Sequence, residues 1–259
     1  MNTLHNLHIL VTRPQPQGEE LCRLIKDHGG QATHFPTIDF APPPDTQAFQ
    51  QALTKLGEQD WLIFISPQAV YATVTHIRRF WPHFPESVKF AAVGAGTAKA
   101  LNEAGYNVAI HPESNWSSEG ILDLPEFHSV AEKKIAIIRG VGGREMLDKY
   151  LAERGAHLLP VIAYERILPE VDINPCLALL KQGTIDIIVC TSYEGVRNLK
   201  LLLGEAGWPY IKDIPLIVMS ERIKLLAHDL GFGKIWVTHN ASQAAVLEIM
   251  VEKGNRDDR

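Results

Sequence analysis

The stretch Asp186-Ile-Ile-Val-Cys-Thr-Ser-Tyr-Glu-Gly-Val196 decides how the rest of the chain is interpreted. It runs from an acidic residue through a short aliphatic segment to two hydroxyl residues, after which the pattern is typical of a helix start. A buried strand that turns directly into a helix presents a hydroxyl and free backbone N–H groups at one edge of a sheet. In open α/β folds, this edge is where ligands bind.

The same pattern occurs earlier, in the stretch Asp60-Trp-Leu-Ile-Phe-Ile-Ser-Pro-Gln-Ala-Val70. Asp60 corresponds to Asp186 and Ser66 to Ser192, so both offsets are 126 residues (186 − 60 and 192 − 66). The chain therefore contains an internal repeat. Because each copy builds a ligand-binding edge, we expect a ligand held between the two.

Short aliphatic segments alternate along the chain with segments whose apolar residues recur at helical spacing. Besides the two quoted stretches, strands are expected at 7–13, 31–36, 88–94, 107–112, 134–140, 215–220 and 234–240. Helices are expected at 18–28, 48–56, 97–104, 144–154, 175–181, 221–230 and 242–253, with a short one from about residue 118. This alternation predicts an α/β protein of two similar domains, each a parallel sheet flanked by helices in the flavodoxin-like manner.

Two arrangements of the repeat are compatible with this pattern. A tandem pair of domains would divide near residue 130. In an exchanged pair, the first βαβ unit of each repeat would join the rest of the other repeat. The chain would then cross between domains through two proline-flanked extended segments, 36–44 and 160–169. The pattern alone leaves both arrangements open.

Composition indicates a globular protein of a reducing compartment. An apolar content of 46%, a charged content of 21% and a net charge of −5 argue against a disordered chain and against a nucleic-acid binder. Cys22, Cys176 and Cys190 form no C-x-x-C motif and are expected to be buried thiols. No signal peptide is indicated and no apolar segment approaches the roughly 20 residues of a spanning helix. We therefore expect a cytoplasmic protein without a membrane partner.

Hydroxyl residues stand where strands are expected to end and helices to begin. Ser66, Ser192 and Ser220 each fit a helix N-cap, which contributes about 1 kcal/mol to stability. Thr191 and Glu194 also fit a capping box, a hydroxyl followed three residues later by Glu. Capping and ligand contact are compatible, and caps at the carboxyl ends of parallel strands face the same crevice.

The segment Val93-Gly-Ala-Gly-Thr-Ala-Lys-Ala-Leu101 contains G-x-G after a strand. A dinucleotide fingerprint needs a third glycine where Lys99 stands, so nucleotide binding is disfavoured. Gly96 and Thr97 are instead expected to form a tight turn, whose N–H groups face an anion or simply cap the helix.

The segment Arg139-Gly-Val-Gly-Gly-Arg144 lacks the Lys-Ser/Thr end of a P-loop. It fits a flexible turn, or else a backbone cradle for carboxylates with Arg139 nearby for bidentate pairing. Arg13 takes the same position in the other repeat, 126 residues earlier (139 − 13).

Tyr164 lies between two apolar segments of the second extended run. It fits a half-buried ring that packs against the partner linker, or a phenol that projects into an interdomain cleft as a hydrogen-bond donor. The eleven histidines show neither H-E-x-x-H nor another metal-ligand spacing, and no Ser-His-Asp or Cys-His set can be argued. We expect no metal.

With these residues in view, the chain resembles the uroporphyrinogen-III synthase family over nearly its whole length. The resemblance rests on an ordered set of motifs: LVTRP near the start, Asp-x-x-x-Phe-x-Ser at 60–66, AVGxxTAxAL at 92–101, the Tyr of VIAYER at 161–166, Asp-Ile-Ile-Val-x-Thr-Ser at 186–192, and the later PLIVMS and VTHNAS. One departure is Ser220-Glu-Arg-Ile223, where the family commonly has Gly-x-x-Thr.

The resemblance implies two α/β domains joined by a two-stranded β ladder. One domain would be discontinuous, 1–36 plus 169–259, the other 44–160, and the linker strands 37–43 and 161–168. The implied enzyme is a cyclising hydro-lyase of tetrapyrrole and heme biosynthesis that uses no cofactor and acts as a monomer. It closes linear hydroxymethylbilane into uroporphyrinogen III with inversion of ring D, through a spiro intermediate bound in the interdomain cleft.

This substrate carries acetate and propionate groups, which backbone N–H groups, hydroxyls and a few arginines can bind. Tyr164 is then the expected proton donor for the leaving hydroxyl. The expected substrate-binding residues are Arg13, Ser66, Gly96, Thr97, Arg139, Gly140, Thr191, Ser192, Ser220 and Ser242. The alternatives from other classes are a non-catalytic two-lobed protein that binds a small anion and a nucleotide-sugar transferase with two Rossmann-like domains.

Overall fold

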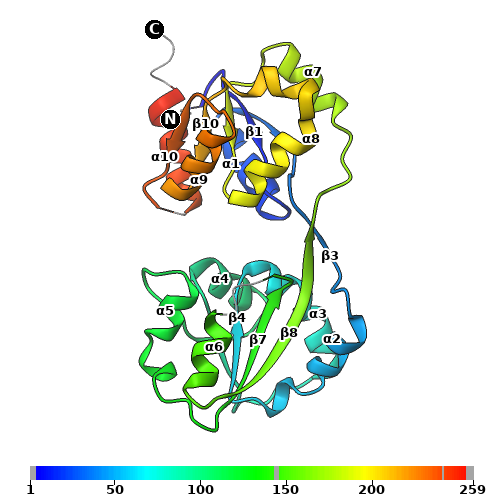
Figure 1. Ribbon diagram of the computed structural model, residues 1–259, viewed down its shortest axis with the longest axis vertical. Coiled ribbons are helices and arrows are strands. Elements are labelled where there is room, and N and C mark those ends of the chain that lie inside the picture. Colours follow the sequence, from blue (N-terminus) through cyan, green and yellow to red (C-terminus); the bar gives the residue numbers. More distant parts are fainter. Residues whose placement is uncertain (1–3, 143–145, 241, 255–259) are drawn as a thin grey trace. The chain divides into compact units, whose positions relative to one another are not determined.

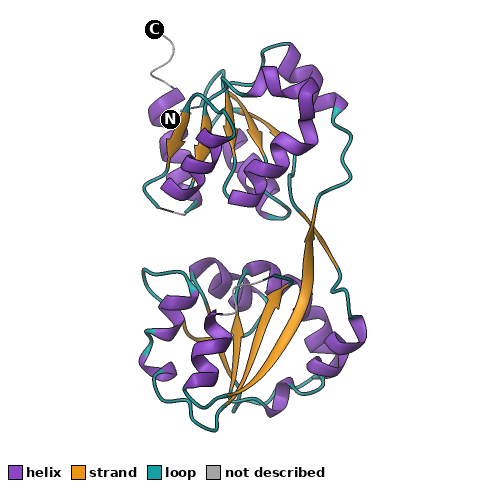
Figure 2. Cartoon of the chain, in the orientation of Figure 1, coloured by secondary structure: helices purple, strands orange, loops and turns teal. Residues whose placement is uncertain are grey.

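The computed structural model describes residues 4–142, 146–240 and 242–254. The expected helix 144–154 and the glycine-rich segment 139–144 therefore fall partly outside the described residues. By their internal contacts, the residues divide into unit 1, which comprises Met1–Asp39 and Ile167–Arg259, and unit 2, which comprises Phe40–Arg166. In each unit a sheet lies between helices (Figures 1 and 2).

Unit 1 contains a five-stranded sheet in the order β11-β10-β9-β1-β2, and every neighbouring pair is parallel. Read from β2, this is the strand order of flavodoxin-like folds. The strands are β1 (His8–Val11), β2 (Gln31–His34), β9 (Ile187–Val189), β10 (Leu216–Val218) and β11 (Ile235–Val237). The helices are α1 (Gln17–Asp27), α7 (Asn174–Lys181), α8 (Tyr193–Ile211), α9 (Glu221–Asp229) and α10 (Gln243–Gly254).

Unit 2 contains a six-stranded sheet in the order β3-β8-β7-β4-β5-β6, parallel from β8 to β6. The strands are β3 (Asp39–Ala41), β4 (Trp61–Phe64), β5 (Lys89–Ala92), β6 (Val108–Ile110), β7 (Lys134–Gly140) and β8 (His157–Ile167). The helices are α2 (Thr46–Leu53), α3 (Pro67–Phe80), α4 (Ala95–Glu103), α5 (Ser118–Leu122) and α6 (Met146–Glu153), with short 3-10 turns at η1 (Leu56–Glu58) and η2 (Pro125–Phe127).

Each sheet combines strands of both repeats. The βαβ unit β1-α1-β2 pairs through β1 with β9, and its repeat counterpart β7-α6-β8 pairs through β7 with β4. The strands are thus arranged in the exchanged manner and not as a tandem. β3 and β8, which carry the chain across the two unit boundaries, are hydrogen-bonded neighbours in the sheet.

Apolar side chains cover both faces of each sheet. In unit 1 one cluster contains Leu10 and Ile188, and the other contains Ile9 and Ile187, because successive strand residues point to opposite faces. The expectation for the thiols is confirmed, since Cys22, Cys176 and Cys190 are buried and free.

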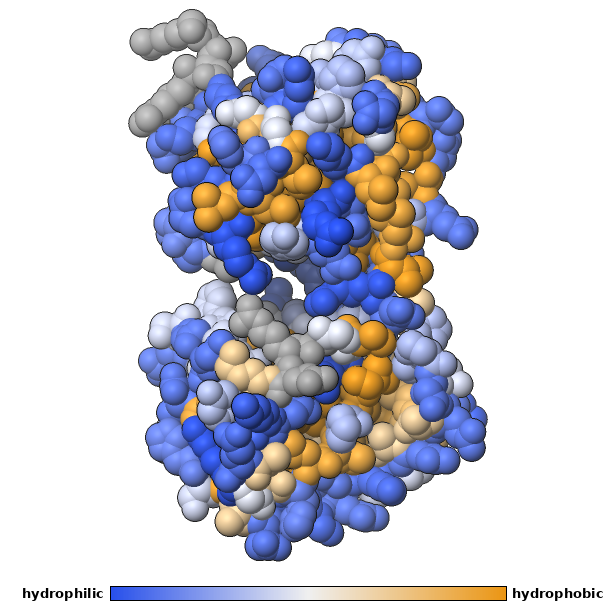
Figure 3. Space-filling model, viewed as in Figure 1, coloured by the Kyte–Doolittle hydropathy of each residue, from blue (hydrophilic) through white to orange (hydrophobic). Residues whose placement is uncertain are grey.

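The outer surface is mainly hydrophilic on the face seen in Figure 3, with apolar strips among the polar residues. None of the helices in the described ranges is long and apolar enough to span a membrane.

Candidate functional site

The helix N-termini gather at one edge of each sheet. In unit 2, α3, α4 and α5 follow the carboxyl ends of β4, β5 and β6. In unit 1, α8, α9 and α10 follow those of β9, β10 and β11. Because the strands are parallel, these termini share one edge of their own sheet, which we call the carboxyl edge of that unit. Their unpaired N–H groups and helix dipoles favour negatively charged ligands.

Ser66 and Tyr164 meet at the carboxyl edge of unit 2. Ser66 is the N-cap of α3, and its Oγ accepts a hydrogen bond from the backbone N–H of Ala69 at 3.1 Å. The same Oγ lies 3.0 Å from the hydroxyl oxygen of Tyr164, a residue 98 positions later in the chain. The structure therefore brings together two of the residues that the sequence predicted for the site.

The aromatic ring of Tyr164 is part of the core of unit 2. Only 3% of the residue is exposed, and the ring packs edge-on against Phe40 of β3, with 5.3 Å between ring centroids. Of the two alternatives for Tyr164, the ring packing against the linker strand is therefore observed, and the role of the hydroxyl as a donor to a ligand stays a prediction. The ring takes the packing position against the linker strand, and the hydroxyl reaches Ser66 at the carboxyl edge.

Gly140 makes room for this tyrosine. A Cβ atom on Gly140 would lie 2.5 Å from Cε2 and 2.7 Å from Cζ of Tyr164, which is closer than real Cβ contacts. The pairing of β7 with β8 also changes register here, since Arg139 pairs with Ile162 but Gly140 pairs with Tyr164. This bulge determines the side to which Tyr164 points.

Gly96 and Thr97 lie inside the first turn of α4. The expected separate turn is wrong, because Gly94 is the N-cap and the helix already starts at Ala95. Thr97 is buried, and its backbone N–H donates to the carbonyl oxygen of Gly94 at 3.0 Å. Gly96 is more open, since a Cβ atom there would have its nearest contact 3.8 Å away, at Pro67. Gly94 provides no side-chain cap for the helix.

Arg139 is held by an ion pair. Its Nη1 lies 2.7 Å from Oδ2 of Asp148 on α6, and the two side chains are 13% and 20% exposed. A guanidinium committed to a nearby carboxylate is less available for a carboxylate of a ligand. The sequence predicted Arg139 as a ligand contact, but the structure gives it a clear structural partner.

Arg13 stands at the same place in unit 1 without such a partner. It directly follows Thr12 at the carboxyl end of β1 and is half-buried. Among the described residues, its side chain makes no hydrogen bond or ion pair. Burial lowers the pKa of Arg13, and the charge of Glu20 opposes that shift. The position that corresponds to Asp148 is Cys22 (148 − 126), which explains the missing carboxylate.

Serine caps begin the helices at the carboxyl edge of unit 1. Ser192 Oγ accepts from Gly195 N at 3.0 Å and Ser220 Oγ from Ile223 N at 3.3 Å. The expectation of serine caps is confirmed at both positions. The capping box at Thr191 is wrong, because the cap is Ser192, which places Glu194 at the second helical position instead of the third.

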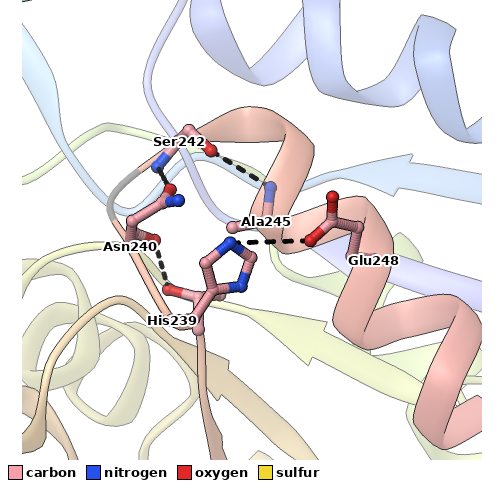
Figure 4. A network of polar contacts seen from close by, with 6 residues as sticks. His239, Asn240, Ser242, Ala245 and Glu248 are labelled. Carbon is pink, nitrogen blue, oxygen red and sulfur yellow. Dashed lines mark hydrogen bonds and ion pairs between the residues drawn. The ribbon is translucent and has the colours of Figure 1, made fainter.

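Ser242 begins the last helix in the same way. Its Oγ accepts from Ala245 N at 3.1 Å, and its backbone N–H donates to Oδ1 of Asn240 at 2.8 Å (Figure 4). His239 Nε2 lies 3.6 Å from Oε2 of Glu248 in the same network. These bonds fix the start of α10, and a ligand contact from Ser242 stays a prediction.

Exposed aromatic residues at both carboxyl edges were missed by the sequence analysis. Trp116, which is 43% exposed, lies against Gly94 after β6. Tyr193, which is 42% exposed, begins α8, and the guanidinium of Arg222 lies 6.0 Å from its ring centroid. The sequence did contain a signal for these residues, namely an aromatic residue between an expected strand and an expected helix.

Within the described ranges, no cluster of three or more His, Cys, Asp or Glu side chains is placed to hold a metal ion. The polar groups at the carboxyl edges include hydroxyls, backbone N–H groups and guanidinium groups. Such groups suit a ligand that carries carboxylates.

Comparisons with known proteins show the family of the chain. The family model of uroporphyrinogen-III synthase HemD matches residues 19–248. The uroporphyrinogen-III synthase of Escherichia coli strain K12 is 33% identical over 250 residues, which cover 94% of this chain and 100% of that protein. That of Salmonella typhimurium strain LT2 is 31% identical over 249 residues, with the same coverage.

Two solved structures show the same fold. A mutant uroporphyrinogen III synthase from the extremely thermophilic bacterium Thermus thermophilus superposes with a TM-score of 0.60 at 15% identity, covering 97% of this chain and 100% of that one. The enzyme from Helicobacter pylori 26695 gives a TM-score of 0.59 at 16% identity, with 95% and 98% covered. The family match and the full-length relatives lead to one conclusion: the chain belongs to the uroporphyrinogen-III synthase family.

Proposed function

We propose that the protein closes linear hydroxymethylbilane into uroporphyrinogen III with inversion of ring D. The observation that carries the proposal is the similarity over 94% of the chain to the whole of the Escherichia coli uroporphyrinogen-III synthase. The carboxyl edges support it, since they present anion-binding groups and a buried tyrosine hydroxyl. Membership of this family does not support the two alternative functions, a non-catalytic anion-binding protein and a nucleotide-sugar transferase.

The reaction removes one molecule of water and needs a proton at its first step. The C–O bond of the hydroxymethyl group breaks, and the oxygen takes its electron pair and a proton to leave as water. The resulting cationic methylene carbon is stabilised by the adjacent pyrrole. The substituted carbon of ring D attacks it and forms a spiro intermediate. Breaking and re-forming the bond to ring D inverts that ring, and the proton then lost restores the donor.

Tyr164 is the proton donor in this proposal. A phenol is protonated at neutral pH and is apolar enough to lie against pyrrole rings. Its ring is fixed by Phe40 and by the space at Gly140, so the hydroxyl keeps a constant position at the carboxyl edge. Orientation of a reactive group contributes to catalysis because it removes the entropy of positioning from the chemical step.

The carboxylates of the substrate bind to helix N-termini and to Arg13. Ser66, Ser192, Ser220 and Ser242 mark four of these N-termini, and the first turn at Gly96 adds backbone N–H groups without a side-chain cap. Thr191, Thr97 and Gly140 border the same edges. Arg13 supplies the positive charge, whereas Arg139 acts mainly through its ion pair with Asp148.

The decisive test is the product formed from hydroxymethylbilane. The purified protein should form uroporphyrinogen III faster than the substrate closes unaided, with the isomers separated by chromatography. Formation of the uninverted isomer alone at the unaided rate would contradict the proposal and favour a binding protein. A rise in thermal midpoint with nucleotides would instead favour a transferase. A monomeric state and a cytoplasmic location stay predictions.

A further inference from the structure

The hydroxyl of Ser66 has two neighbours, and their chemistry restricts where its proton can go. Its Oγ accepts from the backbone N–H of Ala69 at 3.1 Å and lies 3.0 Å from the hydroxyl oxygen of Tyr164. A serine hydroxyl has one proton to donate and two lone pairs that accept. The amide of Ala69 can only donate, so it takes one lone pair. The proton of Ser66 and its second lone pair are both left for Tyr164, so by geometry alone either hydroxyl can be the donor.

We propose that Ser66 is a positioning residue that donates its hydroxyl proton to the oxygen of Tyr164, and thereby leaves the phenol proton for the substrate. This inference rests on the proposed function. It goes beyond that function because Ser66 acts through Tyr164 and not as a direct contact to a carboxylate.

The direction of this hydrogen bond decides whether the phenol can act. If Tyr164 donated to Ser66, its only proton would be used inside the protein. In the proposed direction, the bonds run from Ala69 N–H to Ser66 and from Ser66 to Tyr164, and bonds in such a chain polarise one another. When the O–H bond of Tyr164 breaks, its electron pair stays on the phenolic oxygen. The hydrogen bond from Ser66 then stabilises that charge.

The ring of Tyr164 cannot compensate by moving. It is 3% exposed, it packs against Phe40, and its edge fills the space that a side chain at Gly140 would occupy. The hydroxyl oxygen therefore stays in place, and only the torsion of its proton is free. Among the described residues, the hydroxyl of Ser66 is the hydrogen-bond partner of this oxygen.

The other repeat shows that this pairing is not a general property of the cap. Ser192 caps α8 as Ser66 caps α3, and their positions differ by 126 residues. The position that corresponds to Tyr164 is Ile38 (164 − 126), which is buried and has no polar side-chain group. Unit 1 therefore retains the cap and lacks the phenol, so the Ser66–Tyr164 pair is specific to unit 2.

A double-mutant cycle in the full chain tests the inference. The variants are Ser66→Ala, Tyr164→Phe, the combination of both, and Ser66→Thr, which restores a hydroxyl. Asp45→Ala is the matched control, because Asp45 caps α2 through Ala48 N at 2.8 Å, and α2 is not one of the helices that begin at the carboxyl edge. Initial rates, KM, the isomer ratio and thermal midpoints are measured for each variant.

We expect Ser66→Ala to lower kcat by about tenfold or more while KM changes little, since one positioned proton donor is worth about 10²–10⁴-fold. Adding Ser66→Ala to Tyr164→Phe should change kcat less than about twofold, because coupled residues are not additive. Ser66→Thr should recover most of the rate. Asp45→Ala should lower the thermal midpoint like any lost cap and keep kcat.

Two results would overturn the inference. One is an equal loss of kcat from Ser66→Ala in the wild-type and Tyr164→Phe backgrounds, which would mean that Ser66 acts independently. The other is a kcat for Ser66→Ala as high as that of Asp45→Ala. Failure of the proposed function gives a different result, because the wild-type protein would then form no uroporphyrinogen III.

Discussion

The carboxylate of Asp60 accepts a hydrogen bond from the backbone N–H of Lys134, with 2.8 Å between Oδ2 and N. In the other unit, Oδ2 of Asp186 accepts from the backbone N–H of His8 at 2.6 Å. Both the acids and the donors are 126 residues apart (186 − 60 and 134 − 8). Each bond joins a strand of one repeat to the first strand of the other. These aspartates therefore help to hold the exchanged pairing of strands.

Asp60 should stabilise the protein in a pH-dependent way. The hydrogen bond from Lys134 N lowers the pKa of Asp60; burial opposes this shift, and Lys133 Nζ at 3.0 Å adds to it. With a lowered folded-state pKa, the stabilisation is present above the unfolded-state pKa and lost as pH falls through the folded-state pKa. The side chain is 39% exposed, so solvent screening limits the effect to about 1 kcal/mol or less.

Urea denaturation at pH 7 and pH 3 checks this expectation. Asp60→Asn should lower the free energy of unfolding at pH 7, and the difference from wild type should shrink at pH 3. Glu126→Gln, at an exposed acid of η2, serves as the control and should show no such pattern. An equal difference at both pH values would exclude a contribution from the charge of Asp60.

The space at Gly140 should be essential for the position of Tyr164. In Gly140→Ala, the new Cβ would meet Cε2 of the tyrosine at 2.5 Å, and the buried ring has little room to move. We expect a loss of about 1–3 kcal/mol of stability from overpacking, together with a lower turnover. In Gly96→Ala the nearest atom lies 3.8 Å away, so stability should stay the same or rise by up to about 1 kcal/mol.

Denaturant unfolding and initial rates of both alanine variants separate these effects. A Gly140→Ala variant with wild-type stability and rate would show that the ring of Tyr164 adjusts without consequence. A loss of turnover in a fully stable Gly96→Ala variant would show that the substrate approaches the backbone of α4 closely.

The three thiols should be inert in the folded protein. Burial raises the pKa of Cys176 and Cys190 to about 11, and burial also raises that of Cys22. At pH 8 only about one in 10³ of such thiols is a thiolate, which is the reactive form. Treatment with iodoacetamide at pH 8 followed by mass spectrometry should show little alkylation of the native protein and three modified cysteines in urea. Rapid native alkylation would show that a thiol becomes accessible.

The repeat explains which parts of the structure could be predicted from the sequence. Pairs such as Asp60 with Asp186 and Ser66 with Ser192 predicted the strand ends and helix starts, because the strand period and the cap preference act locally. The proximity of Ser66 and Tyr164 could not be predicted. It depends on the bulge between Arg139 and Gly140, which alters the side to which later residues of β8 point and leaves no clear trace in the alternation of side chains.

The two arginines show a second limit of the repeat. Their equal positions predicted equal roles for Arg13 and Arg139. The difference lies in the neighbouring helix, where Asp148 on α6 corresponds to Cys22 on α1. An ion pair needs two residues. Equivalent positions of the two arginines therefore do not mean that both arginines form an ion pair.

Arg13 and Arg139 should consequently respond differently to substitution. Arg13→Gln should raise KM for hydroxymethylbilane by about tenfold, which corresponds to one charge-assisted contact, with little change in thermal midpoint. Arg139→Gln should lower stability by about 1–3 kcal/mol, because it leaves the largely buried carboxylate of Asp148 without its partner. Adding Asp148→Asn to Arg139→Gln should recover part of that loss. The three variants are compared with the wild type by steady-state kinetics and urea denaturation. An effect of Arg13→Gln on stability alone would contradict this division of roles.

Tyr164→Phe should separate catalysis from packing. The phenylalanine ring keeps the contact with Phe40, and only the bond between the hydroxyl and Ser66 Oγ is lost, so stability should change by about 1 kcal/mol at most. Turnover should fall by up to about 10²–10⁴-fold, the usual contribution of one general acid. Water or a substrate carboxylate can partly replace the phenol, so the product should still be mainly the III isomer.

The measurement is the initial rate from hydroxymethylbilane, with the product isomers separated by chromatography and the thermal midpoint recorded for the same samples. Tyr150→Phe, at a residue of α6 that is 45% exposed, is the matched control and should keep the wild-type rate. A Tyr164→Phe variant with the full rate and an unchanged midpoint would make Tyr164 a packing residue of β8. The proton for the departing hydroxyl would then have to come from water or from the substrate itself.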